Sequence, residues 1–197
     1  DLSFFAERVA NNYDKRRSKA VSNVARDSGE EERPLSHDEA VAQAKQYEQE
    51  HKGAARTIVL DKSGDKVQQL VGAGVSREVA QEWIDEGDSD AAYNEFHDIV
   101  IIFNPRVGKD TLNGYLCHEN AHRYLDSLPE DERARLVDMV YRRLSNADKK
   151  LKEIADYVHE AYADRSEEEQ KEEFVCHFLQ RAAMTKKMTL GENVEYV

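Results

Sequence analysis

Apolar residues recur every three or four positions over most of the chain, which is the spacing of amphipathic helices. In residues 1–53, apolar positions at this spacing lie among many charges over 2–25, and a charged segment with glycine and proline follows at 27–34. Ser36 and Glu39 then form a capping box, which predicts a helix up to the glycine that closes this region. We expect 1–53 to form a helical arm ahead of the main domain.

Two shorter segments predict strands of a small mixed sheet. Residues 55–60 are one, and residues 96–103, with a continuous run of β-branched side chains, are the other. A run of this kind is typical of a strand covered on both faces. Between them, residues 77–86 predict a helix because Ser76 precedes them and a glycine follows.

The chain after residue 109 predicts only helices. Each begins near a residue that can cap a helix N-terminus: Asp110 before a helix over 111–125, Ser127 with Glu130, Ser145, and Ser166 with Glu169. Strands followed by a helical half predict an α+β, mostly helical fold, and we expect 54–197 to form one domain.

Composition excludes two classes of partner. The 197 residues carry a net charge of −12, so no basic surface is expected to replace the counterions of nucleic acid. The longest uncharged apolar run, 99–103, is far too short to span a membrane. Cys117 and Cys176 lie within apolar helical patterns, which favours two buried free thiols over a disulfide.

The segment from His118 to His122 reads His-Glu-Asn-Ala-His and predicts a metal site. Positions four apart on a helix lie one above the other, about 5–6 Å apart, so both imidazoles can bind one ion. Glu119 is rotated by about 100° from His118, beside the ion, where it can serve as a general base. Neutral imidazoles favour Zn²⁺ over calcium or magnesium. The strand that ends before Asn104 is expected to offer an exposed edge to an extended peptide near this helix.

A catalytic zinc needs a third protein ligand and an open fourth position. Position 128 is a leucine, which disfavours the metzincin pattern with its third histidine. Five downstream side chains remain as alternatives: His159, Glu160, Glu172, Glu173 and His177. The residue types alone leave these alternatives open.

The motif together with Glu173-Phe174-Val175-Cys176 resembles the gluzincin zinc metallopeptidases. The nearer resemblance is to lethal-factor-like peptidase domains and to those of polyvalent proteins from phages and mobile elements. It covers about residues 95–180 and implies a zincin-like fold. It also implies that Glu173 is the third ligand, with Glu172 as the alternative, and that Glu119 is the catalytic base.

Two features qualify the resemblance. Asn120 stands where many such motifs carry glycine or an apolar residue, so packing around the site is expected to differ. Such enzymes often stabilise the oxyanion with a tyrosine or histidine, and Tyr124, Tyr157 and Tyr162 are the candidates. His177 is expected to be a core histidine.

The expected function is a zinc-dependent metallopeptidase with a protein or peptide substrate. A metal-activated water would attack the peptide bond, with Glu119 as general base. The alternative is a catalytically inactive zincin-fold module that serves binding or regulation within a larger mobile-element protein.

Overall fold

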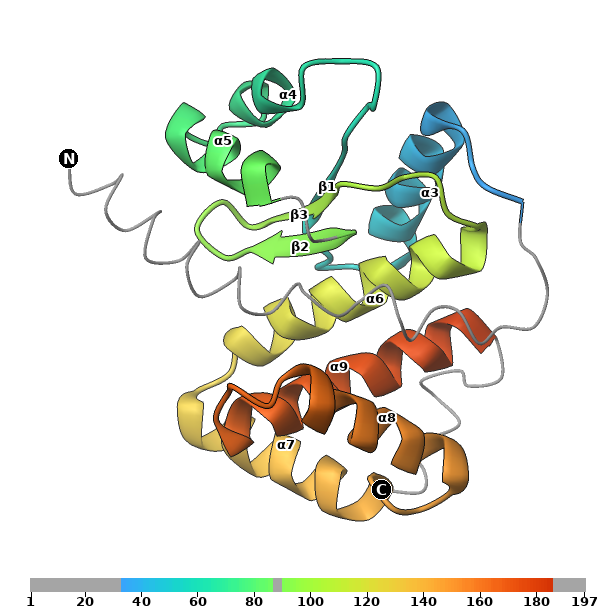
Figure 1. Cartoon of the computed structure of the whole chain (residues 1–197), viewed down its shortest axis with the longest axis vertical. Coiled ribbons are helices and arrows are strands. Elements are labelled where there is room, and N and C mark those ends of the chain that lie inside the picture. Colours follow the sequence, from blue (N-terminus) through green and yellow to red (C-terminus); the bar gives the residue numbers. More distant parts are fainter. Residues whose placement is uncertain (1–32, 87–89, 186–197) are drawn as a thin grey trace.

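The computed structural model describes residues 33–86 and 90–185 (Figure 1). The expected helical segment over 2–25 and most of the linker lie outside these residues. The described elements are α3 (His37–Glu50), β1 (Arg56–Val59), α4 (Lys66–Gly72), α5 (Arg77–Glu86), β2 (Ala91–Asn94), β3 (Ile99–Ile102), α6 (Lys109–Asp126), α7 (Glu130–Leu144), α8 (Lys149–Ala161) and α9 (Glu167–Thr185). The predicted α+β, mostly helical fold with a small mixed sheet is confirmed.

The sheet has the order β1-β3-β2. β1 runs parallel to β3, with Thr57 opposite Val100, and β2 runs antiparallel to it, with Ala92 opposite Ile101. All four residues of β3 are buried, as expected for a strand covered on both faces. Because β3 is the central strand, both of its edges are hydrogen-bonded to neighbouring strands. The expectation that this strand offers an exposed edge to a peptide is wrong.

The strand that was predicted over 96–103 is shorter in the structure. Residues 95–98 form a turn between β2 and β3, and Asp98 has a φ of 49° there. Aspartate tolerates this left-handed conformation better than most residues do. β2 and α4 were not predicted, and both are short elements that depend on contacts with the rest of the fold.

Helices cover both faces of the sheet (Figure 1). On one face, α4 and α5 pack Leu70 and Trp83 against Ile99 and Ile101. On the other face, α3 and α6 enclose a second core that includes Val100 and Ile102. This second face carries the candidate site, because α6 lies between the sheet and α9.

The part of the expected arm that the structure describes contributes to the core. Ala40 and Ala44 of α3 are buried against the sheet and α6. Oε1 of Glu48 accepts a hydrogen bond of 2.6 Å from the backbone N–H of Thr57, so a side chain of α3 occupies the outer edge of β1. α3 therefore packs as a layer of the same domain.

Three of the predicted helix caps are confirmed and three are wrong. Ser76 accepts a hydrogen bond of 3.3 Å from the backbone N–H of Val79 at the start of α5. The capping boxes at Ser36 with Glu39 and at Ser166 with Glu169 form as expected. The residues that instead precede α6, α7 and α8 are Gly108, Pro129 and Asp148, while Ser127 and Ser145 follow the last residues of α6 and α7. Ser127 donates to the Tyr124 carbonyl, so its hydroxyl satisfies an acceptor at the end of a helix.

α6 and α9 pack closely side by side (Figure 1). A Cβ atom added at Gly114 of α6 would lie 2.6 Å from Cγ of Met184 in α9, so the glycine permits this approach. α7 and α8 cover the other side of α9 around Phe174 and Ile154. Each helix in 33–86 and 90–185 is too short or too polar to cross a bilayer.

Candidate metal centre

The predicted metal-binding helix is present as α6, and it buries the whole motif. His118 and His122 are each 1% exposed, and Glu119 is 3% exposed. The four-residue spacing places both imidazoles on the face that contacts α9. Two buried imidazoles on this face need polar partners, and α9 supplies Glu172 and Glu173.

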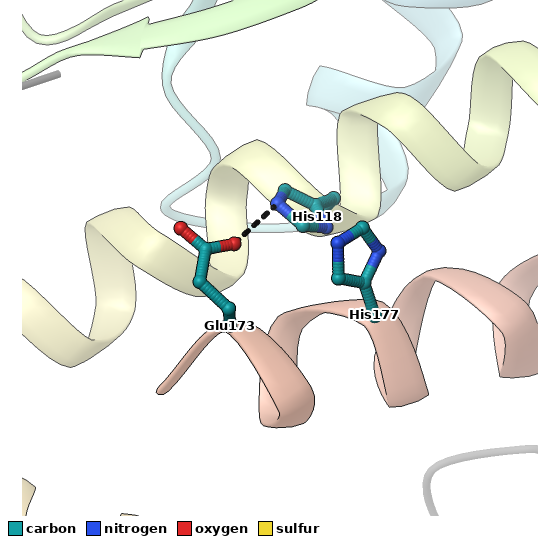
Figure 2. A group of neighbouring side chains, drawn as sticks. All are labelled: His118, Glu173 and His177. Atoms are coloured by element: carbon teal, nitrogen blue, oxygen red, sulfur yellow. Dashed lines mark ion pairs between the residues drawn. The ribbon is translucent and has the colours of Figure 1, made fainter. Parts of the chain in front are cut away.

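Two imidazole nitrogens and one carboxylate oxygen converge between α6 and α9. Nε2 of His118 and Nε2 of His122 are 3.2 Å apart, and each lies 3.6 Å from Oε2 of Glu173. Figure 2 shows Glu173 reaching from α9 toward the ring of His118. A tetrahedral zinc ion with bonds of about 2.0–2.1 Å keeps its ligand atoms about 3.3 Å apart, so this triangle has the dimensions of three zinc ligands.

The two oxygens of the Glu173 carboxylate differ in their partners. The side chain is 1% exposed, and Oε2 accepts no hydrogen bond from any described residue. Its other oxygen, Oε1, accepts a hydrogen bond of 2.8 Å from Nη1 of Arg165. A buried acceptor without a donor costs about 1–3 kcal/mol. The donor set therefore fits a zinc ion, which would occupy the space that Oε2 faces.

Glu172, the alternative to Glu173, lies on the outer side of His122. Its Oε1 is 3.1 Å from Nδ1 of His122, the nitrogen that points away from Glu173. A proton on Nδ1 donates to this carboxylate, which leaves the lone pair of Nε2 directed at the centre. Glu172 is therefore placed to orient His122, while Glu173 is placed to bind a metal ion itself.

Two of the remaining alternatives, His159 and Glu160, do not supply a third ligand. His159 and Glu160 have exposed side chains, and Nδ1 of His159 lies 3.1 Å from Oε1 of Gln170. A nitrogen of His177 does come within 4.8 Å of the ligand atoms of His118 and Glu173 (Figure 2).

The hydrogen bonds of His177 favour the expected core histidine over a metal ligand. Its Nδ1 lies 3.0 Å from Oε1 of Gln180, and its Nε2 lies 3.3 Å from the hydroxyl oxygen of Tyr162. Burial lowers its pKa to about 4, so the ring is neutral at neutral pH. The ring packs against that of His118 with a centroid separation of 4.6 Å. With both nitrogens in hydrogen bonds, His177 supports the ring of His118 from behind.

The charges around the centre favour a protonated His122 and an ionised Glu173. Burial alone would lower the pKa of His122, but Cys176 and Glu173 beside the ring hold that pKa well above its usual value. Burial would raise the pKa of Glu173, but neighbouring positive charges, that of His122 foremost, hold it below its usual value. A metal ion that binds here would displace the proton of His122 and take over the neutralisation of Glu173.

The general-base candidate, Glu119, contacts the edge of the sheet. Its Oε2 accepts a hydrogen bond of 2.8 Å from the backbone N–H of Tyr93 in β2. The edge strand that contacts α6 at Glu119 is therefore β2, and not the expected strand before Asn104. Sequence analysis did not predict β2, because this segment has few residues that favour strands.

A second contact ties the β2–β3 turn to α6, and sequence reasoning missed it. The guanidinium of Arg123, the residue after His122, donates two hydrogen bonds to the carboxylate of Asp98 and one to the carbonyl of Gly53. The hydroxyl of Tyr93 donates to the same carboxylate over 3.2 Å. These bonds hold β2 in place over the motif.

Asn120, the unusual residue of the motif, has a structural role. Its Oδ1 accepts a hydrogen bond of 2.8 Å from the backbone N–H of Ala55, just before β1, and its Nδ2 donates to the carbonyl of Leu116. A glycine or an apolar residue at position 120 has no side-chain oxygen to accept the hydrogen bond from the Ala55 amide. The expectation that packing at Asn120 differs from that of gluzincins stays a prediction.

The three candidate tyrosines differ in position. Tyr162 is 1% exposed and close to His177, while Tyr157 packs edge-on against His177 with a centroid distance of 5.5 Å. Tyr124 is 57% exposed on α6. A role for any of them in stabilising an oxyanion stays a prediction.

Comparison with known proteins adds no relative. No protein-family model matches this chain, and neither a curated protein nor a solved structure matches it significantly. The resemblance to gluzincin peptidases therefore stays a prediction that depends on the motif and on Glu173.

Proposed function

We propose that this protein is a zinc-dependent metallopeptidase that hydrolyses peptide bonds in a protein or peptide substrate. The observation that carries the proposal is the triangle formed by Nε2 of His118, Nε2 of His122 and Oε2 of Glu173, with sides of 3.2, 3.6 and 3.6 Å. Two imidazoles and one carboxylate are a ligand set of catalytic zinc sites, which keep a fourth position open. His118, His122 and Glu173 would hold the ion.

A bound zinc ion supplies Lewis acidity, which polarises a carbonyl group and lowers the pKa of a coordinated water to about 7. Glu119 accepts the proton of the attacking water through its carboxylate and delivers it to the leaving amine. The Tyr93 amide holds Oε2 of Glu119, so the base has a fixed orientation. Glu172 keeps His122 in the tautomer that presents Nε2 to the centre.

The second candidate is a catalytically inactive binding or regulatory module with the same fold, in which zinc is structural or absent. The observation that favours it is burial, because His118, His122 and Glu173 are each 1% exposed. Structural zinc sites are closed to solvent, whereas a peptidase must admit its substrate. The two candidates share the ligands and differ in whether a carbonyl group can reach the ion.

Metal analysis and a cleavage assay test the proposal together. We expect the protein, purified without added zinc, to contain one zinc ion per chain, and His118→Ala to contain almost none. We expect wild type to cleave an unfolded protein such as casein, to stop after chelation, and to recover on addition of zinc. Stoichiometric zinc without cleavage of a broad peptide library would favour the inactive module. Absence of zinc, with none taken up from solution, would contradict the peptidase and favour the inactive module.

A further inference from the structure

Arg165 is a buried cation in the segment between α8 and α9. Its side chain is 5% exposed, and its guanidinium lies 4.4 Å from the centroid of the Tyr162 ring. The backbone N–H of Arg165 donates to the Tyr162 carbonyl over 3.0 Å, which fixes the main chain as well. A buried charge needs a partner of opposite sign, and Nη1 of Arg165 finds it in Oε1 of Glu173 at 2.8 Å.

The two oxygens of Glu173 therefore have separate partners. Oε1 accepts from Arg165, while Oε2 faces the two imidazole nitrogens and accepts no hydrogen bond from the described residues. A carboxylate can bind a metal ion through one oxygen or through both. Because the charge-assisted bond to Arg165 occupies Oε1, turning that oxygen toward an ion would leave the buried guanidinium without its acceptor.

We propose that Arg165 is a positioning residue that restricts Glu173 to one metal-ligand oxygen, so that the protein supplies three ligand atoms and the fourth position stays open. This inference rests on the metal centre of the proposed function. It does not depend on peptide cleavage. Arg165 lies outside the ligand set and acts only through Glu173.

The test uses Co²⁺ in place of Zn²⁺, because the visible absorption of Co²⁺ is strong with four ligands and weak with five. The full chain is compared with Arg165→Gln, which removes the charge and shortens the side chain, and with Arg165→Lys, which keeps the charge and a donor. Arg133→Gln is the matched control, because this arginine pairs with Asp126 at 2.9 Å and lies 4.0 Å from Glu172, the glutamate outside the proposed ligand set. Circular dichroism checks that each variant is folded.

We expect a strong four-coordinate spectrum for wild type and for Arg133→Gln. Arg165→Gln should give the weaker five-coordinate spectrum and bind zinc about 10–100-fold less tightly, as is common when a residue behind a ligand is lost. Arg165→Lys should restore most of the four-coordinate spectrum. A four-coordinate spectrum in folded Arg165→Gln, identical to that of wild type, would overturn the proposal.

A measurement on wild type alone covers the case in which Arg165→Gln fails to fold. The infrared difference spectrum on zinc addition should show a wide separation of the two carboxylate stretching bands, the mark of a one-oxygen ligand. A narrow separation, typical of two-oxygen binding, would overturn the inference. Uptake of neither Co²⁺ nor Zn²⁺ would overturn this inference and the proposed function together. A four-coordinate wild-type centre without peptidase activity would support the inference and contradict only the peptidase.

Discussion

The backbone amide of Tyr93 and the carboxylate of Glu119 are joined by a hydrogen bond of 2.8 Å. This bond connects β2, an edge strand of the sheet, to the glutamate that follows His118 in α6. It fixes one oxygen of Glu119 on the strand. β2 and α6 are therefore held together at Glu119, the candidate general base.

Replacement of Glu119 by glutamine separates chemistry from metal binding. The glutamine oxygen can still accept from the Tyr93 amide, so fold and zinc content should match wild type. An amide cannot take a proton from water, so hydrolysis should fall about 100-fold or more. Steady-state cleavage together with zinc analysis checks this expectation. Cleavage at the wild-type rate would remove Glu119 from the role of base.

The neighbouring glutamates should respond differently to substitution. Glu173→Gln removes the charged ligand oxygen and should abolish tight zinc binding. Glu172→Ala leaves the ligands in place but frees His122 to reorient, so zinc affinity should fall about 10–100-fold. Glu172→Gln is the control, because its oxygen still accepts from Nδ1, and it should bind zinc nearly as wild type does. Titration against a chelating dye measures all three. Equal losses in Glu172→Ala and Glu173→Gln would contradict the assignment of Glu173 alone as ligand.

Asp98→Asn tests the contact that holds the β2–β3 turn on α6. Asparagine tolerates the positive φ at this position, so the backbone should remain unstrained. Loss of the ion pair with Arg123 on a half-exposed site should lower the free energy of unfolding by about 1 kcal/mol. Urea unfolding at neutral pH measures the difference.

The effect of Asp98→Asn should also depend on pH. The hydrogen bond from Arg123 lowers the pKa of Asp98 below its ordinary value of 3.8. A lowered folded-state pKa stabilises the protein above the unfolded-state value, and that contribution is lost as pH falls through the folded-state value. The stability gap between wild type and variant should therefore be constant from pH 5 to 7 and close below about pH 4. A gap that widens on acidification would contradict the assignment.

Gly114→Ala tests the close packing of α6 on α9. The added methyl group would lie 2.6 Å from Cγ and 2.9 Å from Sδ of Met184, so the side chain of Met184 must move. We expect a loss of about 1–3 kcal/mol in the free energy of unfolding, partly recovered when Met184 is also replaced by alanine. Gly72→Ala is the control. A Cβ there meets nothing within 4 Å, and alanine favours the helix, so stability should rise slightly. Thermal unfolding measures all of these variants, and a neutral Gly114→Ala would show that the Met184 side chain moves aside without cost.

The sequence predicted the histidine pair and its helix because that information is local. Spacing by four residues on a helix is sufficient to bring His118 and His122 together. The choice between Glu172 and Glu173 is not local in this sense. The two side chains point about 100° apart on α9, and only the way α9 packs on α6 decides which of them faces the histidines.

Other parts of the fold were not predicted because they also depend on contacts between residues far apart in the sequence. β2 contains two alanines and an asparagine, residues with low preference for strands, and its pairing with β3 makes it a strand. The serines at 127 and 145 resemble N-terminal caps in the sequence, but short connections place them at the ends of the preceding helices. Arg165 gave no signal, because a single arginine among many charges is usually a solvated surface residue.

The proposed ligands belong to helices that are far apart in the sequence, since α7 and α8 lie between α6 and α9. An ion held by all three would act as a cross-link that closes a long loop of the chain. Its binding energy would then add to the cooperativity of folding, and the apparent stability would rise with the free zinc concentration. Zinc supply in the cell would in that case govern how much intact protein accumulates, quite apart from any reaction at the centre.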